Sequence, residues 1–417
     1  MQFTINGGRT LSGSIRVSGA KNAALKFMAA ALLSKETWTL ENVPEIADVH
    51  NLADLLRAIG ADVQHPHENT YVINAKEVQT SELPADLSAK LRSSILCVAP
   101  LLARFGEVRF SFPGGCVLGK RPIDLFLDGY RALGAKVEEK DDVFHISAKK
   151  IQGGEFTFPW ISHTGTESLI LGAVMAQGTT KIINAAMEPE VASLCEWLNS
   201  LGAKIENVGH HTLTIHGVDS LGGGKTRIMP DRIETGTFAV LGNLIGEEIA
   251  ITDTQPEDLA TFWTMLKRAG GNYEINDSTV LVHKAKHLQA LELRTREHPG
   301  FNTDLQPPFT VLLTQASGMS LVQEVIYEGR LFYTDILNRM GAKIIMADPH
   351  RVVVEGPTPL VAKKMESPDI RAGMALVIAA LIAKGKSVID NVQQVDRGYE
   401  RIDQRLRELG AQIERVE

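Results

Sequence analysis

A short pattern recurs six times along the chain, and it constrains the fold more than any other feature of the sequence. In each copy a predicted helix ends in glycine, and a small residue and a predicted strand follow. Glycine suits the left-handed position just beyond a helix C-terminus. Repeats at a constant spacing indicate that one supersecondary unit is used several times. The six glycines lie 68 to 74 residues apart and are Gly60, Gly134, Gly202, Gly270, Gly341 and Gly410.

Each copy contains the same order of predicted elements. An alanine- and leucine-rich helix, such as 20–33, precedes a strand with alternating or β-branched residues, such as 37–43. A polar loop follows, then a second helix that ends in the marked glycine, then a hairpin. We therefore expect a fold of the α/β (α+β) class, built from six βαβαββ-type repeats.

Six repeats of this length divide into two domains of three. The first domain is predicted over 21–229 and the second over 230–417 together with 1–20, so that the chain crosses between them near residues 20 and 229. The extended segment 1–17 is expected to pair with the last repeat. Such a fold serves either as a ring around DNA or as two lobes that close on a small ligand. The net charge of -7 disfavours the ring, because encircled DNA needs cations against its phosphates.

The composition is that of an ordinary globular chain without disulfides. Its 417 residues, 44% of them hydrophobic and 22% charged, are enough for two cores. The three cysteines have no CxxC spacing, and the longest apolar stretches are too short to span a bilayer. The N-terminus has no basic segment followed by an apolar run. These features predict a cytoplasmic protein that binds small molecules rather than nucleic acid or membrane and that has no metal site.

One cysteine has a setting suited to chemistry. Cys116 lies in a glycine-rich loop that also holds Lys120 and Arg121. Nearby cations lower the pKa of a thiol, and glycines let the backbone approach a ligand closely. An incidental cysteine in a flexible surface loop is the alternative. Cys97 and Cys195 lie in apolar helical patterns and are predicted core residues.

Polar residues recur at two places in the repeat, namely the start of the first helix and the loop after the central strand. If the repeats are equivalent, both sets lie on the same face of each domain. Helix N-termini and arginine side chains bind phosphates and carboxylates. Plain capping and salt bridges are the alternative, for Asp231 and Asp369 among others. The cations of these sets are predicted to converge on an anionic ligand, and they are Lys21, Arg92, Lys120, Arg121, Arg371 and Arg397.

Asp304 lies in a turn-rich run that leads into a predicted helix. A carboxylate near a cationic site can act as a general base when geometry brings it to a hydroxyl group. The alternative is that Asp304 caps the helix that follows. The histidines give weaker signals, because no metal-ligand spacing such as HExxH is present.

Five motifs in combination resemble the UDP-N-acetylglucosamine enolpyruvyl transferases of the EPSP synthase family. The similarity runs along nearly the whole chain. It implies an EPSP-synthase-like fold, a two-domain inside-out α/β barrel, with the active site in the cleft between the domains. The motifs are Ser18-Gly-Ala-Lys21-Asn22-Ala-Ala, Pro113-Gly-Gly-Cys116 through Arg121-Pro, Pro230-Asp231-Arg232-Ile-Glu-Thr-Gly, Thr303-Asp304-Leu-Gln and Asp396-Arg397-Gly-Tyr-Glu-Arg.

The resemblance implies a reaction of phosphoenolpyruvate with the 3'-hydroxyl of UDP-N-acetylglucosamine. An enol ether forms by addition and elimination, phosphate is released, and no metal or organic cofactor takes part. This is the first committed step of peptidoglycan synthesis. Fosfomycin, which alkylates thiols and mimics phosphoenolpyruvate, is expected to inactivate such an enzyme at Cys116.

The resemblance also implies roles for individual residues. Cys116 is expected to form an adduct with phosphoenolpyruvate, Asp304 to face the sugar hydroxyl as candidate base, and Asp369 to act in proton transfer. Lys21 and Arg397 are implied in catalysis as well as binding. Contacts to phosphoenolpyruvate are implied for Lys21, Asn22, Cys116, Arg121, Arg371 and Arg397. Contacts to the sugar nucleotide are implied for Asn22, Arg92, Arg121, Pro122, Ile123, Asp124, Leu125, Ser162, His163, Thr164, Gly165, Asp304 and Ile326.

The chain departs from the family pattern mainly on the acceptor side. Phe126 stands where histidine is common, and His163 lies in a segment, 162–166, that replaces Ser-Val-Gly-Ala-Thr. One alternative is therefore an enolpyruvyl transferase that acts on a different nucleotide or hydroxyl acceptor. A second is a non-catalytic paralogue that binds the sugar nucleotide, although all the candidate chemical residues are retained.

Overall fold

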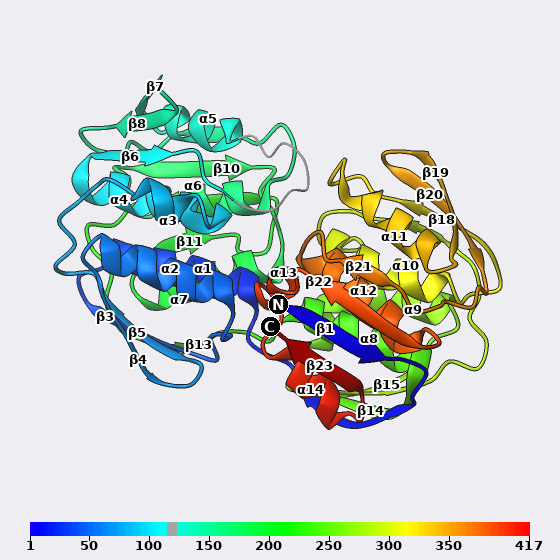
Figure 1. Ribbon diagram of the computed structural model, residues 1–417. Helices are drawn as coiled ribbons and strands as arrows, with labels where there is room; N and C mark the ends of the chain where they lie inside the picture. The colour runs from blue at the N-terminus through cyan, green and yellow to red at the C-terminus, as the bar shows by residue number, and fades with distance from the viewer. Residues whose placement is uncertain (115–122) are drawn as a thin grey trace. The chain divides into compact units, whose positions relative to one another are not determined.

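The structure is a computed structural model that describes residues 1–114 and 123–417. The chain forms two compact units, shown in Figure 1. The first unit contains the described residues 19–114 and 123–229, and the second contains Met1–Ser18 and Pro230–Glu417.

The first unit contains three repeats. Its first repeat comprises α1 (Lys21–Ala30), η1 (Ala31–Leu33), β3 (Thr37–Glu41), α2 (Ala47–Ala58), β4 (Asp62–His67) and β5 (Thr70–Asn74). After α3 (Ala85–Ser88), the second comprises η2 (Arg92–Cys97), α4 (Val98–Phe105), β6 (Glu107–Ser111), α5 (Asp124–Ala132), β7 (Lys136–Lys140) and β8 (Val143–Ser147). The third comprises β9 (Glu155–Thr157), α6 (His163–Ala173), β10 (Thr179–Ile183), α7 (Pro189–Ser200), β11 (Lys204–Glu206) and β12 (Thr212–His216), and β13 (Gly224–Arg227) follows.

The second unit repeats this order after β1 (Gln2–Asn6) and β2 (Leu11–Arg16). The fourth repeat comprises α8 (Arg232–Ile245), β14 (Gly246–Thr252), η3 (Pro256–Leu259), α9 (Ala260–Arg268), β15 (Asn272–Asn276) and β16 (Thr279–His283). The fifth comprises β17 (Glu292–Arg294), η4 (Thr303–Leu305), α10 (Gln306–Leu313), β18 (Gly318–Gln323), η5 (Arg330–Tyr333), α11 (Thr334–Arg339), β19 (Lys343–Asp348) and β20 (Arg351–Gly356). The sixth comprises β21 (Lys364–Glu366), α12 (Ile370–Ile382), β22 (Lys386–Asp390), α13 (Gln393–Asp396), α14 (Ile402–Glu408) and β23 (Gln412–Val416).

Each repeat builds one small sheet, which confirms the predicted sixfold organisation. Five sheets have four strands, such as β11-β12-β10-β9, in which β9 pairs parallel with β10 and the hairpin is antiparallel. The second repeat has three strands, because residues 81–83 replace the first strand with a bridge and two backbone hydrogen bonds to Arg109. The sheets of the described residues are open and separate, so the barrel of the expected fold is six small sheets rather than one closed cylinder.

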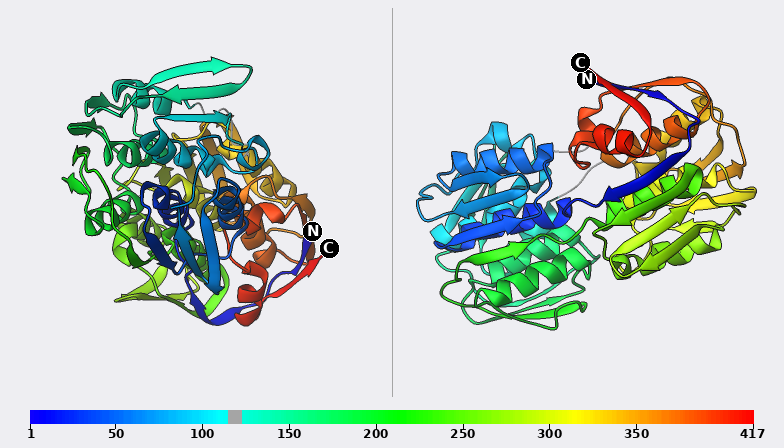
Figure 2. Two further views of the ribbon diagram at one scale, coloured as in Figure 1. Left: turned by 90° about the vertical axis from the view of Figure 1, so that its left-hand side faces the viewer. Right: turned by 90° about the horizontal axis from the view of Figure 1, so that it is seen from below.

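The N-terminal segment completes two sheets of the second unit. As predicted, β1 pairs with the last repeat, where it lies between β22 and β23 and is antiparallel to both. Both chain ends therefore lie in this sheet, as Figures 1 and 2 show. The following strand, β2, pairs parallel with β14 of the fourth repeat.

The six marked glycines adopt the left-handed conformation that the sequence predicts. Their φ angles lie between 82° at Gly134 and 105° at Gly202. Residues with a Cβ rarely adopt these angles, so glycine at these positions fixes the turn from the second helix into the hairpin.

The first helix of each repeat is buried inside its unit. In the second unit α10 packs against α8 and α12, and almost every residue of α12 is buried. A helix that is apolar on all sides must lie in a core. The strands have alternating burial, as β12 does, so one face of each sheet packs on the core and the other faces solvent. The predicted core cysteines, Cys97 and Cys195, are both fully buried, and burial raises the pKa of each thiol to about 12.

Candidate active site

Helix starts and the loops after the central strands meet within a repeat. The first helix leads away from the end of the repeat at which it starts, and the next strand runs back to that end. The start of the helix and the loop after the strand therefore lie at the same end of the repeat. In the fifth repeat, Arg330 after β18 donates from Nη1 to Asp304 Oδ1 before α10, at 2.7 Å. In the first repeat, Lys21 Nζ at the start of α1 lies 2.6 Å from Oδ2 of Asp48 in α2. In the fifth repeat the sequence pattern therefore selects two side chains that are in contact, whereas Asp48 is not part of that pattern.

Asp304 is held between two buried arginines. Its Oδ1 accepts from Arg330, and its Oδ2 accepts from Nε of Arg371, in the first turn of α12, at 3.0 Å. Both arginines are only 4% exposed, whereas the Asp304 side chain keeps 20% of its surface accessible. A partly accessible carboxylate with two buried cations is a composition that suits the recognition of a small acid.

The two arginines fix the charge of Asp304. Burial alone would raise the pKa of this carboxyl group, but Arg371 and Arg330 hold that pKa well below its usual range. Burial opposes the charge of both arginines, and the Asp304 carboxylate more than offsets it, so their pKa values rise. Asp304 is thus ionised at neutral pH and is a weak proton acceptor while both arginines donate to it. An anion that takes over one arginine would make it more basic.

Each arginine also has a buried N–H group that meets no acceptor in the described part of the chain. Arg330 Nε and Arg371 Nη1 have no hydrogen-bond acceptor among the described residues. The Arg330 guanidinium lies 4.8 Å from the Tyr327 ring, and that of Arg371 lies 5.3 Å from the Tyr399 ring. A buried donor without a partner costs about 1–3 kcal/mol, which an anionic ligand would recover. The sequence pattern includes Arg330, with Glu328, among the polar residues of the loop after the central strand, but it assigned Arg330 no contact to either substrate.

Aspartates at the starts of α8 and α12 act as N-caps. Asp231 Oδ1 accepts from the backbone N–H of Ile233 at 2.7 Å, and Asp369 Oδ1 accepts from that of Arg371 at 2.8 Å. The capping alternative therefore describes both residues in this structure. Asp369 nevertheless adjoins Arg371, and its expected part in proton transfer stays a prediction.

Arg397 lies on the segment that covers Arg371. It follows α13, and its Nη1 donates to Gln394 Oε1 at 3.1 Å. The next residue is Gly398, where an added Cβ would lie 3.6 Å from Arg371 Nη1 and 2.5 Å from the Ile370 side chain. Glycine at this position lets the segment approach the start of α12. The segment that carries Arg397 therefore passes close to Arg371.

Two of the cations predicted to bind the ligand, Lys21 and Arg92, belong to the first unit and lie at the starts of their helices. Lys21 is the first residue of α1, and the half-buried Asn22 follows it. Arg92 is the first residue of η2, and its guanidinium lies 5.5 Å from the ring of Phe112, which is half exposed. Each residue therefore occupies the helix-start position predicted for it.

The start of α6 carries an ionic network that the sequence did not predict. Ser162 caps the helix, and its Oγ accepts from the backbone N–H of Gly165 at 3.1 Å. His163 Nε2 lies 3.1 Å from Oε1 of Glu167, and Lys26 Nζ lies 3.3 Å from Oε2 of the same carboxylate. Burial would lower the pKa of His163, but Glu167 outweighs burial and raises it.

Other implied contacts differ in accessibility. Asp124 at the start of α5 is exposed and Ile326 is half-buried. Ile123 and Leu125 lie in the core of the first unit with 3% and 9% exposure, and Phe126 with 5%. The side chains of these three core residues therefore offer little surface to an acceptor. Cys116, Lys120, Arg121 and Pro122 lie outside the described residues.

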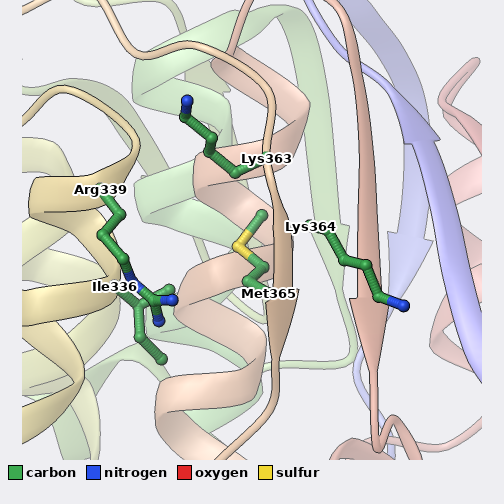
Figure 3. Close-up of a pocket in the computed structure, with 5 residues that line it drawn as sticks. All are labelled: Ile336, Arg339, Lys363, Lys364 and Met365. Carbon is green, nitrogen blue, oxygen red and sulfur yellow. The ribbon is translucent and has the colours of Figure 1, made fainter.

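The described residues contain neither a cluster of three or more potential metal-binding side chains nor a helix suited to crossing a membrane. Figure 3 shows a cavity of about 300 Å³ in the second unit, lined by Ile336, Arg339, Lys363, Lys364 and Met365. Lys364 points away from the others there, and its Nζ lies 3.2 Å from Asp390 Oδ2. The cavity contains no residue implied in the reaction.

Comparison with solved structures identifies the fold. An enolpyruvyl transferase, NikO from Streptomyces tendae, matches with a TM-score of 0.90 and 26% identity over 99% of this chain and 98% of its own. An EPSP synthase from Acinetobacter baumannii matches with a TM-score of 0.77 and 18% identity over 99% of each chain. The expected EPSP-synthase-like fold is confirmed.

Comparison of sequences identifies the family. Residues 5–406 match the family model of EPSP synthase (3-phosphoshikimate 1-carboxyvinyltransferase). UDP-N-acetylglucosamine 1-carboxyvinyltransferase from Campylobacter hominis is 41% identical over 99% of this chain and 98% of its own length. The proteins of that name from Koribacter versatilis (100% of this chain, 96% of its own) and Helicobacter pylori (97% of each) are 42% and 40% identical. The chain therefore belongs to the EPSP synthase family of carboxyvinyltransferases.

Proposed function

We propose that this enzyme transfers the enolpyruvyl group of phosphoenolpyruvate to the 3'-hydroxyl of UDP-N-acetylglucosamine and releases phosphate. One observation supports this most directly. Asp304, the residue expected to face the acceptor hydroxyl, is bound by two buried arginines, each with one N–H group that no described residue accepts from. The names and high coverage of the sequence relatives point to the same reaction.

The reaction places defined demands on the protein. The acceptor oxygen attacks C2 of phosphoenolpyruvate while C3 gains a proton, which gives a tetrahedral intermediate. Loss of that C3 proton and cleavage of the C2–O bond to phosphate then restore the double bond. The enzyme must therefore take a proton from the hydroxyl, move a proton to and from C3, and hold two anionic groups on one carbon.

The described residues of the second unit are suited to two of these demands. Arg330 and Arg371 present two guanidinium groups on either side of Asp304, and such groups match carboxylate or phosphate oxygens in pairs. When an acidic substrate takes over part of this bonding, Asp304 becomes a better base for the neighbouring hydroxyl. We assign Arg397 and Lys21 to the phosphate, as the family resemblance implies.

The remaining demands fall on residues assigned by resemblance. We assign the C3 proton transfer to Cys116 and Asp369, and phosphate contacts also to Arg121 and Asn22. We propose that Arg92 and the start of α6 contact the sugar nucleotide. We also propose that both units contribute to one active site and that the protein works in the cytoplasm, where reducing conditions keep Cys116 a thiol.

The proposal differs from its first alternative, an enolpyruvyl transferase with a different acceptor, only in the identity of the acceptor. Phe126 is a departure from the family pattern, but it is buried in the core of its unit. It therefore does not favour a different acceptor. His163 is the departure that remains near the implied nucleotide contacts, and it is engaged by Glu167.

The proposal is tested by measuring phosphate release from phosphoenolpyruvate with a panel of nucleotide sugars. We expect release that depends on UDP-N-acetylglucosamine and that falls about 100-fold or more in Arg371→Met. Arg339→Met is the matched control, because Arg339 is exposed on the same unit and pairs with Asp335, which has no assigned role. If phosphate is released with a different acceptor but not with UDP-N-acetylglucosamine, the proposed acceptor is wrong. If no acceptor leads to phosphate release, the proposed reaction is wrong.

A further inference from the structure

A buried glutamate joins the two segments that hold Asp304 and Arg330. Glu324 directly follows β18 and is fully buried. Its Oε2 accepts from Oγ1 of Thr303, the residue before Asp304, at 2.8 Å. Its Oε1 accepts from the backbone N–H of Ile326 at 2.8 Å and from that of Tyr327 at 3.2 Å. Nothing in the family motifs above includes this residue.

These bonds close a ring of contacts around Asp304. On one side Glu324 holds Thr303, and Thr303 is covalently joined to Asp304. On the other side Glu324 holds Tyr327, whose ring lies 4.8 Å from the Arg330 guanidinium that donates to Asp304. Both sides therefore lead from one carboxylate to the two members of the Asp304–Arg330 pair.

The burial of Glu324 depends on the hydrogen bonds that its carboxylate accepts. An ionisable group without solvent contact costs free energy unless all its acceptor sites are satisfied. The Glu324 carboxylate accepts four hydrogen bonds, the fourth from Thr295 Oγ1 at 3.0 Å. An apolar residue at this position would leave the hydroxyls of Thr295 and Thr303 and the backbone N–H groups of Ile326 and Tyr327 without this acceptor, and both segments untied.

We propose that Glu324 is a positioning residue that keeps Arg330 and Asp304 in register for the reaction. The inference rests on the proposed function, because it assigns a purpose to that same pair. Glu324 itself need not touch a substrate. The charged groups that influence Asp304 are Arg330 and Arg371. The negative charge of Asp369 also stabilises the charge of Arg330, and the positive charge of Arg330 favours the ionised form of Glu324.

Thr303→Val is the sharpest test, because it removes one bond and keeps the shape of the side chain. Among the described residues the Thr303 hydroxyl donates to Glu324. The matched control is Thr358→Val, which removes a buried hydroxyl bonded to Thr314 O, at the opposite end of α10. We expect kcat to fall about tenfold in Thr303→Val, since small displacements of reacting groups are costly, and to stay unchanged in Thr358→Val.

Two further measurements separate positioning from general stability. Loosening Arg330 from Asp304 raises the pKa of Asp304, so the acidic limb of the kcat/KM profile moves to higher pH in Thr303→Val. Glu324→Ala shows a larger loss of turnover, and Glu324→Gln recovers most of it, because the amide oxygen still accepts from Ile326 and Tyr327.

The outcomes distinguish this inference from the proposed function. If Thr303→Val matches the wild type in kcat and in pH profile while the wild type turns over, the positioning role is wrong and the function stands. If the wild type is inactive, the pKa of the Asp304 carboxyl is measured by NMR in both proteins without substrate. A higher pKa in Thr303→Val supports the link from Glu324 to Asp304, and equal values overturn it.

Discussion

Asp304→Asn tests the electrostatic arrangement of the site. The change keeps the shape of the side chain but removes the negative charge that pairs with both Arg330 and Arg371. Removing one partner of a buried ion pair costs about 3–5 kcal/mol. Because Asp304 is one-fifth accessible, we expect the lower end, about 3 kcal/mol. In a unit of this size that loss corresponds to a decrease in Tm of about 6–12 °C.

The pH dependence of this effect has a definite sign. The native pKa of Asp304 is depressed, so the carboxylate stabilises the folded state fully above its unfolded pKa of about 3.9. That stabilisation is lost as the pH falls below this value toward the native pKa. The difference in stability between wild type and Asp304→Asn is therefore constant from pH 7 to pH 5 and decreases in more acidic solution.

Thermal and urea denaturation measure the stability difference, and phosphate release measures turnover. Asp335→Asn is the matched control, because Asp335 is an exposed carboxylate of the same unit and should change stability by no more than about 0.5 kcal/mol. We expect Asp304→Asn also to lose about 100-fold or more in kcat, since an amide cannot act as a base. A variant that is as stable as the wild type, or that keeps its turnover, would refute the reasoning.

Three further predictions follow from other parts of the chain. Fosfomycin should label Cys116 alone, because Cys97 and Cys195 are buried thiols with a pKa of about 12; peptide mass spectrometry showing label on either of them contradicts this. His163→Gln should be less stable than the wild type below pH 6.5, and this difference in stability should disappear as the pH rises through the raised native pKa of His163. Denaturation at pH 6 and at pH 8.5 measures the difference, and an equal difference at both values contradicts the prediction. Gly202→Ala should lower the free energy of unfolding by about 1–2 kcal/mol through its φ of 105° alone, since no atom lies near the added methyl group. Gly222→Ala is the control, because Gly222 has an ordinary φ and the change should be nearly neutral. Equal urea midpoints for the two variants would show that the left-handed turn is unimportant.

The sequence predicts the repeats well because their signals are local. A glycine after a helix specifies its own backbone conformation, and all six marked glycines have positive φ. The place of β1 in the last sheet was also predictable, since an extra extended segment must find an open edge or position in a sheet. The bridge that replaces a strand in the second repeat was not predicted, because residues 81–83 have no distinct strand pattern.

The contacts of the candidate site depend on packing between repeats, which local patterns do not encode. Arg371 reaches Asp304 across the boundary of the fifth and sixth repeats, 67 residues along the chain. The sequence placed both residues at helix starts, but the partner of each is set by how α10 packs against α12. Ile123 and Leu125 illustrate another case, because the resemblance implies contacts for the segment that contains them, and the fold buries their side chains in its core.

A time course by ³¹P and ¹H NMR tests the central claim most directly. With phosphoenolpyruvate, UDP-N-acetylglucosamine and wild-type protein, we predict that the phosphoenolpyruvate phosphorus signal is replaced by inorganic phosphate at the rate at which new vinyl protons appear on a product linked through the sugar 3'-oxygen. Phosphate that appears without that enol ether, or phosphoenolpyruvate that stays unchanged in the presence of the acceptor, would contradict the account.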